Sequence, residues 1–170
     1  DRVGEGALRI GDERCVSYGD PATVACLRAE GWATVYASDA RSVTAPVAWP
    51  PAAATRLVLG DSDGVHVSSD LGDTWETTLA LDDPAAVLTE ADDGTLLLAT
   101  RAGRLLSSRD GGDTWTDAGW QLPSTPHVLV ARPAFATHPD VLFGTHDGVW
   151  LSTAFATPAR FAPYERLDDR

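Results

Sequence analysis

The sequence has no methionine, few basic residues and only two cysteines, and each shortage narrows what the protein can be. Its 170 residues include 13 lysines and arginines against 25 aspartates and glutamates, which gives a formal net charge of −12. Such a surface repels nucleic acid and anionic membranes, and no basic stripe offsets it. We therefore expect no nucleic-acid partner. Because the chain begins at Asp1 and lacks methionine, we also expect that a leader or an upstream region has been removed.

Long apolar runs and helical periodicity are missing too. No run approaches the roughly 18 apolar residues that a membrane span requires, so we expect no such span. No stretch of useful length repeats apolar residues at helical spacing. Hydrophobic residues nevertheless make up 44% of the chain, which is typical of a packed core and not of disorder.

The patterns that mark common catalytic and metal sites are also absent. A Ser-His-Asp mechanism has no nucleophile-elbow motif to support it. Zinc lacks a ligand set, because the four histidines are scattered and the cysteines lack CxxC spacing. The segment 61–64, Asp-Ser-Asp-Gly, begins like a calcium loop, but further oxygen ligands and a distal glutamate do not follow. We interpret it as a hairpin turn, with calcium as the alternative, and predict no catalytic residue, no metal and no cofactor.

The two cysteines fit opposite strands of one hairpin. Residues 15–18 and 23–26 are two short strand-like segments around a turn centred on Asp20-Pro21, so Cys15 and Cys26 are register partners. The Cβ atoms of such partners lie about 4.5–5.5 Å apart, close to disulfide range. We predict a disulfide and hence an extracytoplasmic location. The alternative is a pair of small buried hydrophobic residues.

The main feature that is present is the pattern Ser-x-Asp-x-Gly-x-Thr-Trp, which occurs twice. Its first copy consists of Ser68, Asp70, Gly72, Thr74 and Trp75, and its second of Ser108, Asp110, Gly112, Thr114 and Trp115. The aspartates can accept backbone N–H groups in a tight turn, and the glycines can take a positive φ. Each tryptophan begins the next strand, where its ring can pack beneath the turn. Because the whole pattern repeats, we interpret it as structural; a metal or catalytic role for Asp70 and Asp110 is the alternative.

This pattern resembles the Asp-box, or BNR repeat, of sialidases, sortilin-type receptors, xyloglucan-cleaving hydrolases and photosystem assembly factors. In that family the motif is a β-hairpin turn of a propeller blade. The resemblance implies an all-β fold of four-stranded β-propeller blades, each about 40–45 residues long. That period divides the chain, as a single domain, into four units over about 5–40, 43–80, 85–119 and 127–167. The fourth unit keeps Ser152, but its motif is degraded beyond that residue.

The strands favour blades that are covered on both faces. Residues 96–98 are Leu-Leu-Leu and residues 141–143 are Val-Leu-Phe, so neither segment alternates between apolar and polar residues. A strand has this composition when both of its faces are buried.

Asp-box propellers usually have about six blades or more. We therefore expect an incomplete ring that a longer chain, other chains or copies of this chain complete, because open strand edges invite association.

The resemblance leaves the function open, because the motif stabilises a turn and does no chemistry. The first arginine of sialidases lies in an aromatic-Arg-Ile-Pro motif, whereas residues 8–11 here are Leu-Arg-Ile-Gly. Tyr164 and Glu165 are adjacent, so their side chains point to opposite sides of a strand. We predict a non-catalytic secreted scaffold or recognition module that binds a protein or glycan partner. The alternative is a portion of a carbohydrate-active glycoside hydrolase, sialidase- or xyloglucanase-like, that lacks its catalytic residues here.

The expected binding residues lie in loops at one end of the blades. In a propeller, the loops that join blades and the loops that join the middle strands share one face, opposite to the Asp-box turns. This arrangement selects Arg101, Trp120, His146 and Asp147 as candidate binding residues. Trp120, predicted to lie in a polar loop, is suited to stack on a sugar or a partner; packing over a blade edge is the alternative.

Overall fold

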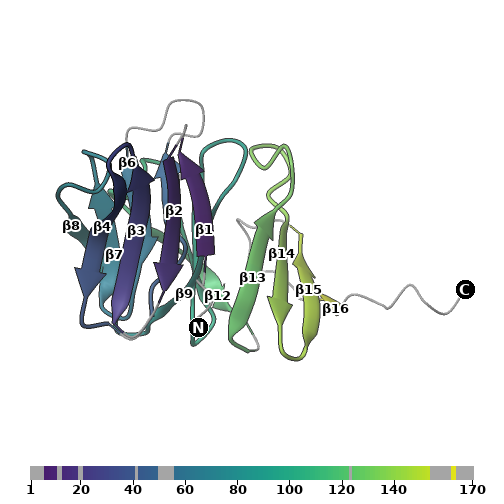
Figure 1. Cartoon of the computed structure of the whole chain (residues 1–170). Helices are drawn as coiled ribbons and strands as arrows, with labels where there is room; N and C mark the ends of the chain where they lie inside the picture. The colour runs from purple at the N-terminus through teal and green to yellow at the C-terminus, as the bar shows by residue number, and fades with distance from the viewer. Residues whose placement is uncertain are drawn as a thin grey trace, which may run out of the picture.

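The chain folds into four antiparallel β-sheets of four strands each (Figure 1). The computed structural model describes residues 6–10, 13–18, 21–40, 42–49, 56–122, 124–153 and 162–163. Every regular element within these residues is a β-strand. They contain no helix that is long and apolar enough to cross a membrane. The predicted all-β fold of propeller-like blades is confirmed, and the four sheets do not close into a ring.

Each sheet is a meander, because its strands are adjacent in the order of the sequence. Sheet 1 contains β1 (Gly6–Ile10), β2 (Glu13–Tyr18), β3 (Ala22–Arg28) and β4 (Gly31–Ser38). Sheet 2 contains β5 (Val47–Trp49), β6 (Arg56–Gly60), β7 (Gly64–Ser68) and β8 (Glu76–Ala80). Sheet 3 contains β9 (Ala85–Glu90), β10 (Leu96–Thr100), β11 (Arg104–Ser108) and β12 (Thr116–Gln121). Sheet 4 contains β13 (Pro126–Ala131), β14 (Val141–Thr145), β15 (Gly148–Ser152) and β16 (Ala162–Pro163).

Consecutive sheets meet mainly through their first strands. β1 contacts β5, β5 contacts β9, and β9 contacts β13. The first strand of each sheet therefore lies nearest a common axis, and the later strands lie progressively further out, as in propeller blades. The degraded motif that was expected after Ser152 falls on residues 154–161, which lie outside the described residues.

β10 shows how a single strand is buried on both faces. Leu96 and Leu98 belong to the apolar cluster between sheets 2 and 3. Leu97 and Ala99 belong to the cluster between sheets 3 and 4. All four side chains are completely buried, because successive residues of a strand point to opposite faces and a sheet covers each face. This arrangement explains why the apolar run does not alternate with polar residues.

The same register recurs from sheet to sheet. Leu57, Leu96 and Val141 pair with the serines Ser68, Ser108 and Ser152 of their respective sheets. The next residues along β6, β10 and β14 are therefore equivalent: Val58, Leu97 and Leu142. The first two face the following sheet and are 0% exposed, whereas Leu142 is 37% exposed. No described sheet follows sheet 4, and the face that would meet it is open.

The disulfide predicted from the sequence is present. Cys15 and Cys26 are bonded to each other. They are direct partners in the ladder between β2 and β3, with their Cα atoms 4.0 Å apart. Both are buried in the cluster between sheets 1 and 2, so the bond crosses the hairpin on the face that packs against the next sheet.

We predict that Leu97→Ala and Leu142→Ala differ in their effect on stability although the two positions are equivalent in register. Leu97→Ala removes a fully buried side chain and should lower the free energy of unfolding by about 2–5 kcal/mol. Leu142→Ala should lower it by less than about 1 kcal/mol, because that side chain already contacts solvent. Urea unfolding at low protein concentration measures both. Equal losses would show that the outer face of sheet 4 is covered.

Candidate binding surface

The two ends of the sheets form two different surfaces. One end carries the turns that join the middle strands, such as the β6–β7 and β10–β11 turns, and the connections between sheets. We call this end the loop face. The other end carries the two repeated Ser-x-Asp-x-Gly-x-Thr-Trp turns, which join β7 to β8 and β11 to β12. We call it the turn side.

Hydrogen bonds connect the segments of the loop face in series. The amide of Leu81 donates to the carbonyl of Asp63 at 2.9 Å, and the amide of Arg101 donates to the carbonyl of Pro84 at 2.8 Å. The Thr125 hydroxyl then donates to the carbonyl of Arg101 at 2.9 Å. These bonds join the β6–β7 turn to the β8–β9 connection, then to the β10–β11 turn, and finally to the β12–β13 connection. The loops therefore form one tethered surface across sheets 2 to 4.

Asp61 anchors this surface to sheet 1. Its carboxylate is 1% exposed and accepts hydrogen bonds from the Tyr36 hydroxyl at 2.6 Å and the Ser38 hydroxyl at 2.9 Å. It also accepts the Asp63 amide at 2.8 Å and lies 3.1 Å from the His66 ring. Burial opposes the charge, but the hydrogen bonds from His66, Tyr36 and the Asp63 amide outweigh it and lower the pKa of Asp61 below its usual value. The carboxylate thus stabilises a hairpin turn over 61–64, as predicted.

A cavity of about 380 Å³ opens on the loop face. Its lining residues come from sheets 3 and 4 and from the segment before β5: Ser42, Val43, Ala85, Ala86, Arg101, Thr125, Pro126 and His127. Arg101 is exposed, and its guanidinium has no ion-pair partner among the described residues. The described residues contain no group of three or more His, Cys, Asp or Glu side chains that could hold a metal ion. The cavity can therefore offer a cation, an imidazole and a hydroxyl to a ligand.

Three of the four candidate binding residues lie on this face. Arg101 lines the cavity. The ring of His146 lies edge-on to that of His127, with 4.2 Å between their centroids, and His127 also lines the cavity. Asp147 follows in the same turn and is exposed. No sequence pattern singles out His127, because it lies in a strand; the irregular pairing of β13 with β14 around it brings it to the rim.

Trp120 lies in strand β12, not in a loop as the sequence analysis predicted. Gly119 has a φ of 75°, and its amide donates to the side chain of Asp117 at 2.8 Å. The ladder shifts register there, and pairing resumes between Gln121 and Arg104. This irregularity carries β12 past the glycine, where an ordinary strand would end. The side chain of Trp120 lies outside the described part of the chain.

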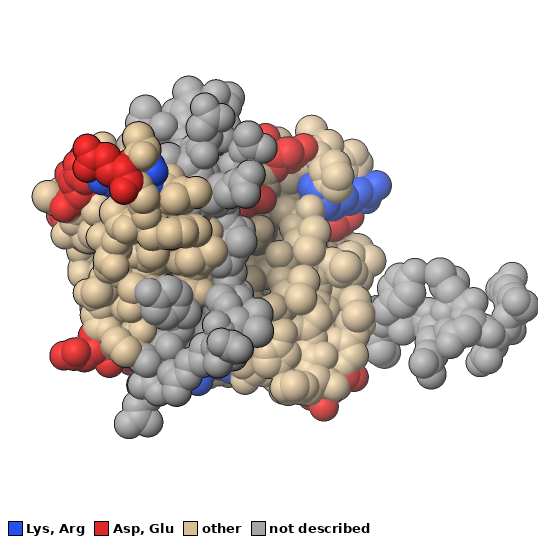
Figure 2. Space-filling view, in the orientation of Figure 1, with Lys and Arg blue, Asp and Glu red and all other residues tan. Residues whose placement is uncertain are grey.

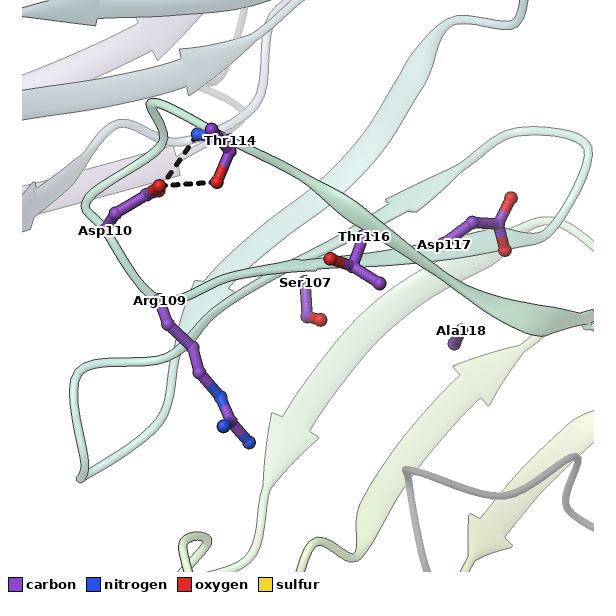
Figure 3. A pocket seen from close by; sticks show the side chains of 7 residues that line it. All are labelled: Ser107, Arg109, Asp110, Thr114, Thr116, Asp117 and Ala118. Carbon is purple, nitrogen blue, oxygen red and sulfur yellow. Dashed lines mark hydrogen bonds between the residues drawn. The ribbon is translucent and has the colours of Figure 1, made fainter.

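The two repeated turns share one set of hydrogen bonds. In the first, Asp70 accepts the amide of Thr74 at 2.8 Å and its hydroxyl at 2.6 Å. The Ser68 hydroxyl donates to Asp70 at 2.7 Å and accepts the Gly72 amide at 2.7 Å. Asp110 makes the same bonds to Thr114, as Figure 3 shows. Each aspartate thus reaches an amide four residues on.

These hydrogen bonds favour the ionised aspartates. The Thr74 hydroxyl and amide, followed by the Ser68 hydroxyl, lower the pKa of Asp70 to about 2. Burial acts in the opposite direction on Asp110, but its bonds to Thr114 and Ser108 outweigh burial and lower the pKa of Asp110 to about 2 as well. Ionised acceptors that fill their lone pairs within a turn are suited to structural roles.

Each turn also packs closely on the preceding sheet. A Cβ added to Gly72 would lie 2.7 Å from Cβ of Val35 in sheet 1, and Gly72 has a φ of 100°. A Cβ added to Gly112 would lie 3.0 Å from Cγ2 of Val67 in sheet 2, and Gly112 has a φ of 95°. Glycine is therefore needed at both positions for two reasons, the backbone conformation and the room between the turn and its neighbour.

The sequence predicts that the Trp75 ring packs beneath its own turn. In the structure, Trp75 instead bridges two sheets. Its indole N–H donates to the carbonyl of Val35 at 2.6 Å. Its ring meets Tyr36 of sheet 1 edge-on, with centroids 5.2 Å apart. Trp115 differs, because its indole N–H donates to the carbonyl of Gly112 in its own turn at 3.0 Å.

Arginines of the preceding sheet hold both turns. Arg28 reaches Asp73 at 3.1 Å and also donates to the carbonyl of Leu71. Arg56 reaches Asp113 at 2.8 Å in the same way. Asp73 and Asp113 occupy the same position of the pattern, directly before the threonine. The sequence pattern therefore encodes contacts between sheets as well as the turn itself.

A second cavity, of about 400 Å³, lies on the turn side beside β11 and β12 (Figure 3). Its lining is mostly polar and consists of Ser107, Arg109, Asp110, Thr114, Thr116, Asp117 and Ala118. Arg109 is exposed and has no ion-pair partner among the described residues. In contrast to the loop face, this cavity is lined by residues of one sheet, within two neighbouring strands and the turn between them.

Comparisons with known proteins identify the fold. No protein-family model matches the sequence, and no curated protein is similar to it. Among solved structures, the chain is similar to YCF48 bound to a D1 peptide, with a TM-score of 0.59 and 16% identity over 89% of this chain and 50% of that one. BamB from Moraxella catarrhalis matches with a TM-score of 0.60 and 19% identity, over 90% of this chain and 46% of that one. The nidogen/laminin complex contains a match with a TM-score of 0.59 and 12% identity, over 89% of this chain and 61% of that one.

These similarities place the chain in the class of β-propeller proteins. Sequence identities of 12% to 19% show the fold alone. The chain spans about half the length of the YCF48 and BamB structures that it matches. Its four sheets therefore correspond to about half of such a propeller.

We predict that Gly72→Ala destabilises the protein more than Gly31→Ala does. Gly31 has a φ of 119° and no atom within 4 Å of an added Cβ, so its substitution tests backbone strain alone, which we expect to cost about 1–2 kcal/mol. Gly72→Ala adds a steric conflict with Val35 and should cost about 1–3 kcal/mol more. Urea unfolding compares the two variants. Equal losses would mean that the turn does not pack tightly on sheet 1.

We predict that Glu90 makes stability fall as the pH rises. Glu90 is half-buried at the end of β9, and its Oε1 has no hydrogen-bond partner among the described residues. Burial raises the pKa of its carboxyl from 4.5 to about 7. Between these values the folded state binds more protons than the unfolded state, so the free energy of unfolding decreases with increasing pH.

Glu90→Gln should remove this dependence, because the amide does not ionise. The variant should be more stable than the wild type above about pH 7, and the difference should shrink as the pH falls toward about 4.5. Urea unfolding of both proteins across this range provides the measurement. A stability difference that stays constant with pH would contradict the prediction.

Proposed function

We propose that this chain is a non-catalytic recognition module that binds a protein partner through its loop face. The observation that carries the proposal is the tethered set of loops around the cavity of about 380 Å³. Loops held by a rigid scaffold can present fixed contacts at little entropic cost on binding. Arg101, His127 and His146 supply polar and cationic groups at its rim.

The solved structures support a protein partner over a small-molecule substrate. One propeller that the chain resembles was solved with a D1 peptide, and another belongs to a nidogen/laminin complex. Among the described residues of this chain, the carboxylates of the repeated turns and Asp61 are engaged in structural hydrogen bonds. Glycan binding at the same rim is the weaker form of the proposal, since the tryptophan expected to stack on a sugar lies in β12.

The proposal also covers the nature of the repeated turns, the domain organisation, the location of the protein and the completion of the ring. The two repeated turns are Asp-boxes, and the four sheets form one propeller-like domain. The protein works in an extracytoplasmic compartment, because a disulfide between Cys15 and Cys26 persists where conditions are oxidising. Further blades, from a longer chain, from another chain or from a copy of this one, complete the ring, because the sheets are open at the end formed by sheet 4.

The proposal predicts a difference between two arginines of sheet 3. Arg101 and Arg109 are both exposed, and neither has an ion-pair partner among the described residues. Arg101 lies on the loop face and Arg109 on the turn side. Arg101→Glu should weaken the binding of a selected peptide at least about tenfold, a loss typical of an anchoring arginine at an interface. Arg109→Glu, the matched control, should leave it unchanged.

The experiment uses peptides selected by display on the immobilised chain, with affinities measured by calorimetry. Loss of binding with Arg101→Glu alone supports the loop face as the binding surface. Loss with Arg109→Glu alone would overturn this assignment and point to the cavity on the turn side. A parallel glycan array tests the weaker form: glycan binding that Arg101→Glu abolishes, with no selected peptide, would replace the protein partner by a sugar.

A further inference from the structure

The outer face of sheet 4 is apolar and exposed. Val130, Leu142 and Leu151 form one cross-strand row, and Val128 and Val149 flank Gly144 in the next. The exposed fractions of these valines and leucines range from 36% to 51%. Figure 2 shows that the surface over β13–β15 presents uncharged side chains, with charged ones confined to its upper and lower ends. A contiguous exposed apolar face of this kind is typical of surfaces that bind a partner.

The equivalent faces of sheets 2 and 3 show what such a face binds. Leu142 is equivalent in register to Val58 and Leu97, which are fully buried against the following sheet. Val149 is likewise equivalent in register to Val65 and Leu105, which are also fully buried. The outer face of sheet 4 therefore repeats a surface that this chain buries twice under the next propeller blade.

The opposite end of the stack offers the matching surface. Trp32 of β4 and Trp75, which directly precedes β8, occupy the same place in their sheets, one residue before the ladder partners of Cys26 and Val67. Trp75 is half-buried, because its ring packs on Tyr36 of the preceding sheet. Trp32 has no preceding sheet among the described residues and is 57% exposed. The outer face of sheet 1 thus carries a tryptophan suited to pack on a preceding blade.

We propose that a second copy of this chain covers the outer face of sheet 4 with the outer face of its own sheet 1. The proposal rests on the ring completion included in the proposed function, and it names the partner. The three contacts between sheets within the chain are all of this head-to-tail kind, in which the face of one sheet meets the opposite face of the next. A head-to-tail contact between copies forms a closed ring when the rotation permits.

The extent of the stack favours closure by two copies. The chain covers 50% and 46% of two of the propeller structures that it matches. Four sheets that occupy half of a ring leave room for four more, which a second copy supplies. The two chains then share two identical contacts, each between sheet 4 of one copy and sheet 1 of the other.

Sedimentation velocity of the full chain tests this arrangement over a wide range of concentrations. We expect a species of twice the 18.0 kDa mass of one chain. Leu142→Asp and Trp32→Asp should each convert it to monomers, because each variant places a charge in both contacts of the ring. An equimolar mixture of the two variants should recover dimers, because one of the two contacts is then free of substitutions.

Ala80→Asp adds the same charge at an exposed position of β8 and should leave the dimer unchanged. Circular dichroism checks that all variants keep the β-sheet spectrum. A wild-type chain that stays monomeric at every concentration would overturn the proposal. So would a dimer that Leu142→Asp dissociates but Trp32→Asp does not, since that pattern indicates two copies of sheet 4 face to face. Neither result affects the test of the loop face with Arg101→Glu.

Discussion

The packing of each sheet between two neighbours is the constraint on which the rest of the structure depends. Because the side chains of a strand alternate, a strand buried on both faces must be apolar at successive positions, as Leu96, Leu97 and Leu98 are. Burial of this kind supplies most of the driving force for folding. A single sheet therefore depends on its neighbours for stability. A sheet with a neighbour on one side only, such as sheet 4 among the described residues, leaves an apolar face exposed. The contrast between buried Leu97 and exposed Leu142 follows directly.

The repeated turns serve the same packing. Asp70 and Asp110 close their own turns with hydrogen bonds, but Gly72, Trp75 and Asp73 contact the preceding sheet. One short pattern therefore specifies a local conformation and a contact with a residue about 40 positions earlier. This double role gives a physical reason for all five positions of the pattern to recur together in sheets 2 and 3.

The loop face derives its rigidity from this framework. Asp61 joins a turn of sheet 2 to Tyr36 and Ser38 of sheet 1, and backbone hydrogen bonds continue the connection to sheet 4. The backbone of Arg101 is consequently held by hydrogen bonds to Pro84 and Thr125. A surface built in this way can vary its exposed side chains without loss of the fold, which suits recognition.

The sequence by itself determined the local features of this protein. The register of Cys15 with Cys26, the hairpin at 61–64 and the strands that are apolar on both faces all depend on hydrogen bonds and periodicities within a few residues. Tertiary structure decided which side chains meet across sheets. It placed Trp75 on Tyr36, brought His127 beside His146, carried Trp120 into β12 and left Leu142 exposed. These outcomes depend on contacts between distant segments and on which described sheets have a neighbour, and no local pattern contains that information.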